Sequence, residues 1–102
     1  MERQPEEIYQ EIAQNIQRAI GDDAQWEEAW LDVEMQTDHS TIKAKYQVAG
    51  VARPHSFVAG YRTNQLFAEL QAIMQQPGQV PWRQSQFKLW PDGRYEVAFQ
   101  YP

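Results

Sequence analysis

The spacing of apolar residues changes once, early in the chain, and this change constrains the fold more than any other feature. Isoleucine recurs every fourth residue from Ile8 to Ile20, which is the spacing of one helical face. From Ala29 the spacing falls to two residues, which is typical of a strand with one buried side. Because Pro5 suits a first helical turn and Gly21 a helix C-cap, the sequence predicts a helix between them, followed by a strand.

Two pairs of alternating segments predict two antiparallel hairpins. The first covers residues 29–48 and turns at the polar residues 37–40. The second covers residues 86–101 and turns at Pro91-Asp92-Gly93, where glycine supplies the positive φ of a tight turn. Phe99 is expected to face the core of this second hairpin, so its truncation to alanine is expected to be costly.

A second helix is predicted between the hairpins, capped by Thr63 or Asn64 and ended by residues 77–78. Phe57 and Val58 indicate a short third strand before it. The predicted fold is therefore α+β, with residues 1–102 forming a single domain. Two amphipathic helices pack on one face of an antiparallel sheet of four to five strands, in the order α-β-β-(β)-α-β-β. The apolar face of the second helix is expected to hold Leu66, Phe67, Leu70, Ile73 and Met74.

Composition narrows the class of protein. The chain has 102 residues, of which 42% are hydrophobic and 13% aromatic, enough for one modest core. A secreted domain of this size would normally depend on disulfides, and the chain has no cysteine. We expect no signal peptide, and no apolar run in the sequence is long enough for a membrane span. We therefore expect a cytoplasmic protein without membrane association.

Residues able to carry out catalysis are few. The histidines His39 and His55 both fall in predicted turns or loops, without the spacing of metal ligands. The carboxylate pairs at 22–23 and 27–28 lie side by side in or next to a polar connector, where solvation is the simplest reading. Phosphate-binding loops and nucleophile elbows are absent from the sequence. The sequence thus predicts no enzyme, no metal site and no cofactor.

Charge is distributed unevenly along the chain. Residues 1–38 hold eleven acids and two bases, a net charge of −9, whereas residues 39–102 hold three acids and seven bases, a net charge of +4. The acidic half repels phosphate and attracts basic proteins. A sheet face with basic residues and Trp90 is the alternative, since it would stack on single-stranded nucleic acid. We disfavour direct nucleic-acid binding, because acids are expected on the same face as the bases: Asp32, Glu34 and Glu96 beside Lys43, Lys45 and Lys88.

The acidic segment contains two tryptophans, and this combination predicts a protein-binding surface. Charges steer a basic partner towards the surface, and aromatic rings supply desolvated contact area. Two plainer readings stay open: each acid belongs to a solvated face, or residues 49–61 fold over the tryptophans Trp30 and Trp90. The predicted partner-binding residues are Asp22, Asp23, Trp26, Glu27, Glu28, Trp30, Asp32 and Glu34.

Several segments together resemble the YezG-like immunity (antitoxin) family of bacterial toxin–immunity systems. The resemblance runs from about Glu6 to the end of the chain and rests mainly on positions that build the fold. These are the helix at residues 7–13, the strand at residues 26–35, the Leu66-Phe67-x-x-Leu70 helix, the Pro81-Trp82 pair, and the closing residues 92–101.

The resemblance implies a cytoplasmic protein that binds and neutralises a cognate toxin, commonly a nuclease, made by the same cell. It implies no catalytic residues, and its toxin-facing residues have no motif that could be carried over. An adaptor or chaperone-like module that escorts a secreted effector would share the acidic charge and the lack of an active site, so it stays as the alternative.

Overall fold

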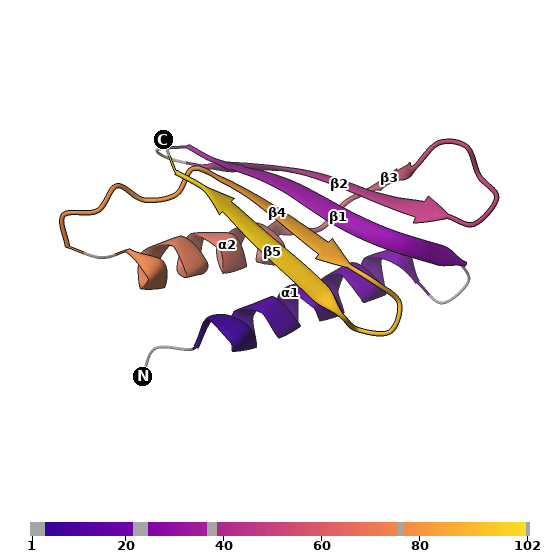
Figure 1. Ribbon diagram of the computed structural model, residues 1–102, viewed down its shortest axis with the longest axis horizontal. Helices are drawn as coiled ribbons and strands as arrows, with labels where there is room; N and C mark the ends of the chain where they lie inside the picture. Colours follow the sequence, from indigo (N-terminus) through magenta and orange to yellow (C-terminus); the bar gives the residue numbers. More distant parts are fainter. Residues whose placement is uncertain (1–3, 22–24, 37–38, 76, 102) are drawn as a thin grey trace.

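The computed structural model describes residues 4–21, 25–36, 39–75 and 77–101. Its five strands form one antiparallel sheet in the order β3-β2-β1-β4-β5, and both helices lie on the same side of it (Figure 1). The predicted α+β fold is confirmed, and the third strand is present, at His55–Phe57 instead of at Phe57 and Val58. Along the described residues the elements are α1 (Pro5–Ile20), β1 (Trp26–Met35), β2 (Ser40–Val48), β3 (His55–Phe57), α2 (Tyr61–Met74), β4 (Gln84–Leu89) and β5 (Tyr95–Gln100).

Helix α1 has the bounds that its sequence signals predict. Pro5 is at the start of the helix, and Gly21 follows its last residue with a φ of 83°, a value that glycine adopts without strain. Ile8, Ile12 and Ile16 are fully buried, so the four-residue repeat is the face that packs on the sheet.

Helix α2 begins earlier than predicted, and neither expected residue caps it. Gly60 occupies the N-cap position and offers no side chain to the first turn. The Thr63 hydroxyl donates instead to the carbonyl of Ala59 at 2.9 Å. The Asn64 amide donates to the carbonyl and the hydroxyl of Ser40, at 3.0 and 2.7 Å. Both polar side chains therefore serve other contacts, and Asn64 ties α2 to the start of β2.

A bulge at the start of β1 changes the direction of its first tryptophan. Trp26 pairs with Val48, whereas Glu28 pairs with Gln47, so one extra residue lies in β1 at this point. After the bulge, the residues that face the helices alternate regularly along β1. Trp26 is half-buried and packs against the hydrophobic core. The buried residues of β1 are Ala29, Leu31, Val33 and Met35.

The second hairpin completes the core because β4 pairs with β1. Phe87 is fully buried, as is Trp82, which lies in a connection where no core residue was predicted. The Gln71 side chain donates to the Trp82 carbonyl at 2.8 Å and ties this connection to α2. Phe99 contacts the Trp82 ring, with 5.1 Å between ring centroids. It lies on the predicted side of β5, but it is only half-buried because β5 is the edge of the sheet.

Candidate functional site

The face of the sheet that points away from the helices, called the outer face here, carries a line of predicted binding residues. Glu28, Trp30, Asp32 and Glu34 alternate along β1 with the buried residues and therefore share this face. Neighbours in the line are about 6.7 Å apart, so the line runs for about 20 Å. Because β1 is the central strand, the line follows the middle of the outer face.

The structure brings together five of the eight predicted binding residues. Glu27 lies at the bulge and is exposed beside Glu28, at one end of the line. Trp26 is not part of this surface, because the bulge directs it towards the core. Asp22 and Asp23 lie outside the described residues.

Basic residues from neighbouring strands flank the line of acids on both sides. Trp30 lies between Lys45 of β2 and Lys88 of β4. Lys43 lies opposite Asp32, whereas Lys45 faces Trp30 and Glu34 faces Thr41. The outer face is therefore electrostatically patterned, with carboxylates along the middle and amines beside them.

One end of the outer face is aromatic. A shallow hollow there is lined by Glu27, Glu28, Trp30, Gln47 and Trp90. The side chain of Gln47 donates to the carbonyl of Val48 at 3.2 Å, which keeps its amide at the strand end. This end combines two indole rings with two carboxylates; aromatic rings are enriched in protein interfaces, and charges steer the approach of a partner.

Contacts from neighbouring residues partly cover the aromatic end, where Trp30 and Trp90 are both half-buried. The amine of Lys88 lies 4.0 Å from a carboxylate oxygen of Glu28. The guanidinium of Arg94 lies over the Trp90 ring, 4.8 Å from its centroid. Strand β3 pairs with β2 and widens the sheet, so the prediction that residues 49–61 fold over the tryptophans does not hold for this strand.

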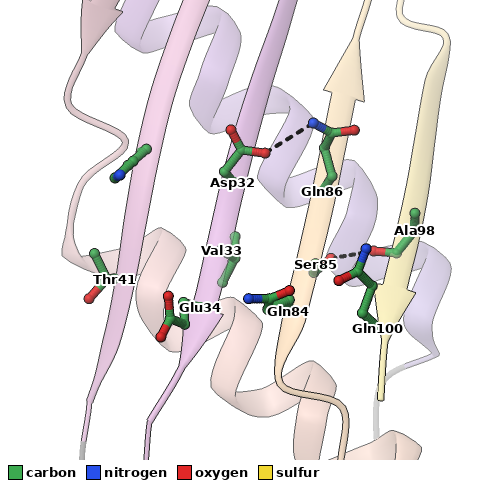
Figure 2. A pocket seen from close by; sticks show the side chains of 10 residues that line it. Asp32, Val33, Glu34, Thr41, Gln84, Ser85, Gln86, Ala98 and Gln100 are labelled. Carbon is green, nitrogen blue, oxygen red and sulfur yellow. Dashed lines mark hydrogen bonds between the residues drawn. The ribbon is translucent and has the colours of Figure 1, made fainter. Parts of the chain in front are cut away.

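The other end of the outer face holds a polar groove of about 370 Å³ (Figure 2). The Gln86 amide donates to a carboxylate oxygen of Asp32 at 3.0 Å. Glu34 forms no ion pair with another described residue. The small side chain of Ala98 on β5 leaves space above the sheet here. The outer-face residues that line the groove are Asp32, Glu34, Thr41, Lys43, Gln84, Gln86, Ala98 and Gln100.

The glutamines of this groove were missed by the sequence reasoning. Gln84, Gln86 and Gln100 read locally as ordinary polar positions of a hairpin. Gln84 and Gln86 lie opposite Glu34 and Asp32 because β4 pairs with β1, fifty or more residues away in the sequence. Gln100 lies beside Gln84 because β5 pairs with β4. Strand alternation predicts which side of the hairpin Gln86 and Gln100 occupy. No local pattern predicts which other strand the hairpin will pair with in the sheet.

Among the described residues, no cluster of three or more His, Cys, Asp or Glu side chains is arranged to hold a metal ion. On the helix side of the sheet, burial, with a contribution from nearby Tyr95, raises the pKa of Tyr9 above its usual value. Tyr9 packs against Phe87 and Tyr95 on the helix side, so this shift reflects core packing.

Comparison of the chain with known protein families and with curated proteins finds no match. Within the part of the chain that the structure describes, neither helix has the length and apolar character needed to cross a membrane. The outer face carries the features of this chain that bear on its function.

Proposed function

We propose that this chain is a cytoplasmic immunity protein that binds a cognate bacterial toxin through the outer face and so blocks it, without catalysing a reaction. One observation carries the proposal: Trp30 lies on the open side of the central strand, in line with Glu28, Asp32 and Glu34. An indole ring amid carboxylates suits a partner that presents basic side chains around an apolar pocket.

The dimensions of the outer face suit a protein partner. Five strands at a spacing of about 4.8 Å span about 20 Å across the sheet, and at about 3.3 Å per residue their lengths run from about 10 Å for β3 to about 33 Å for β1. A standard interface, roughly 800 Å² per partner, would use this face whole, together with the turns at its ends. Nanomolar affinity corresponds to about −12 kcal/mol, which a few aromatic anchors within such an interface can supply.

The charge pattern favours a nuclease as the toxin. A nuclease binds phosphates with basic residues, and carboxylates in a line present negative charge to those residues. The lysines Lys43, Lys45 and Lys88 beside the line would then meet acidic groups at the rim of the toxin. The resemblance to YezG-like immunity proteins supports the same proposal, including a role in inhibition between neighbouring bacteria.

The proposal can be tested with two aromatic-to-alanine variants. Affinity capture from lysate of the source cells, with mass spectrometry, is expected to retrieve the toxin with the wild-type chain and with Tyr61→Ala. It is not expected to retrieve the toxin with Trp30→Ala. Tyr61 is a suitable control because its ring is 78% exposed and lies on α2, away from the outer face.

The captured protein is then expressed in cells with and without this chain. We expect the captured protein to arrest growth when it is expressed alone. Co-expression of the wild-type chain or of Tyr61→Ala should restore growth, and co-expression of Trp30→Ala should not. A captured protein that is harmless alone would contradict an immunity role and support the alternative of an adaptor that escorts an effector.

The double variant His39→Gln/His55→Gln is expected to protect cells as well as the wild type. Both histidines are exposed, and neither lies on the outer face beside Trp30. Surface substitutions of this kind change stability by about 0.5 kcal/mol or less. Protection is measured by colony counts after toxin induction, and folding by thermal unfolding. A folded double variant that no longer protects would point to imidazole chemistry in place of binding alone.

A further inference from the structure

The two edges of the sheet differ in how they are protected. Edge strands of soluble proteins are usually short, or carry proline, lysine or a bulge, which prevents pairing with another chain. The edge at β3 fits this rule, because β3 has three residues and follows Pro54. The edge at β5 is less protected: it has six residues, Tyr95–Gln100, with no proline or lysine and with Glu96 as its one charge, and it pairs with β4 without a register shift.

The helix-facing side of β5 is also incompletely covered. Tyr95, Val97 and Phe99 point towards the core but are each only half-buried. Their neighbours on β4, Phe87 and Leu89, are fully buried. The difference arises at the edge, because no other strand of the described residues lies on the outer side of β5 (Figure 1). A strand added at this edge would bury the rest of these three side chains.

The turn of the second hairpin shows which backbone N–H and C=O groups of β5 point away from β4 and can form hydrogen bonds with another strand. The amide of Trp90 donates to the carbonyl of Arg94 at 2.9 Å. Hydrogen-bonded pairs alternate along an antiparallel ladder, so the backbone groups of Glu96 and Ala98 point towards β4. Those of Tyr95, Val97 and Phe99 therefore point out of the sheet edge and can pair with another strand.

We propose that β5 pairs antiparallel with β5 of a second copy of this chain, about a two-fold axis at Val97. The pattern of β5 is self-complementary in this register, because Tyr95 faces the second copy's Phe99 and Val97 faces its counterpart. Glu96 faces Ala98, so no like charges oppose each other. A shift of the axis to Glu96 would place two carboxylates directly opposite, which is unfavourable.

The paired edges join two sheets in one plane, and the outer face of each copy stays open. The contact is at the small end of specific interfaces, so we expect a monomer–dimer equilibrium instead of an obligate dimer. Sedimentation equilibrium of the wild-type chain is expected to show its mass rising from 12.0 kDa towards twice that value as concentration increases.

Cysteine variants test the register, since the natural chain has no cysteine. Glu96 and Ala98 of opposite copies form a pair without backbone hydrogen bonds, with Cα atoms about 4.5 Å apart, which suits a disulfide. The variant Glu96→Cys/Ala98→Cys is therefore expected to form a covalent dimer on mild oxidation. Glu96→Cys alone, Ala98→Cys alone and Ser56→Cys at the β3 edge are expected to stay monomeric on a non-reducing gel.

Each result decides the proposal. A covalent dimer from the double variant, with none from the single variants, supports pairing about Val97. A disulfide from Glu96→Cys alone or from Ala98→Cys alone places the axis elsewhere and overturns the register. A constant 12.0 kDa mass of the wild type, with no covalent dimer from a correctly folded double variant, overturns the pairing itself. Thermal unfolding of every variant shows whether its fold is intact.

Discussion

Replacement of Phe87 by alanine is expected to lower the free energy of unfolding by about 3–5 kcal/mol. Phe87 is fully buried on β4, opposite Leu31 of the central strand. Its ring stacks on Tyr95 at 5.6 Å between centroids and contacts Tyr9 of α1 at 6.4 Å. The change removes contacts with both layers and leaves a cavity between them. Because a domain of this size is stable by about 5–15 kcal/mol, chemical denaturation should reveal a large loss.

The variant Phe99→Ala is the matched comparison. Both residues are phenylalanines of the second hairpin, but Phe99 is half-buried at the sheet edge. We therefore expect a smaller loss of unfolding free energy than the sequence alone suggested for Phe99. An equal or larger loss from Phe99→Ala would show that the core does not centre on Phe87.

The parts of the fold that the sequence predicts correctly depend on local patterns. The four-residue repeat of isoleucines gave α1, and the two-residue alternation with Asp92-Gly93 gave the second hairpin. The errors occur where tertiary contacts override local preference. Asn64 bonds to Ser40 instead of capping α2, and Trp82 is buried in a connection that has no periodicity.

The candidate site was predictable to a similar extent. Strand alternation places Trp30, Asp32 and Glu34 on one face, and the structure agrees. The bulge that turns Trp26 inwards leaves no trace in the alternation, because it falls at the start of the strand. The pairing of β1 with β4, which brings Gln86 to Asp32, depends on global packing and could not be inferred from local pattern.

Reversal of two acids on the outer face is expected to slow toxin binding far more than it weakens the fold. In the variant Asp32→Lys/Glu34→Lys, the middle of the face becomes positive beside Lys43, so it repels the basic partner. Electrostatic steering raises association rates by about 10–10³-fold, and reversal should remove this gain. Both residues are exposed, and Glu34 forms no ion pair among the described residues, so the fold should persist. Stopped-flow or surface-binding kinetics with the captured toxin measures the rate.

A control with the same change in net charge separates local steering from global charge. Glu6→Lys/Glu7→Lys alters two exposed acids of the first turn of α1, on the side of the sheet opposite the outer face. This control loses some helix stability, because acids favour a helix N-terminus by about 0.3–1 kcal/mol each, but its association rate should fall much less. The association rate of the wild type should also fall with added salt, because salt at 0.1 M largely screens exposed charges that are more than about 10 Å apart. If the two variants bound the toxin at the same rate, the toxin would not meet the acids of β1, and the interface would lie on another surface.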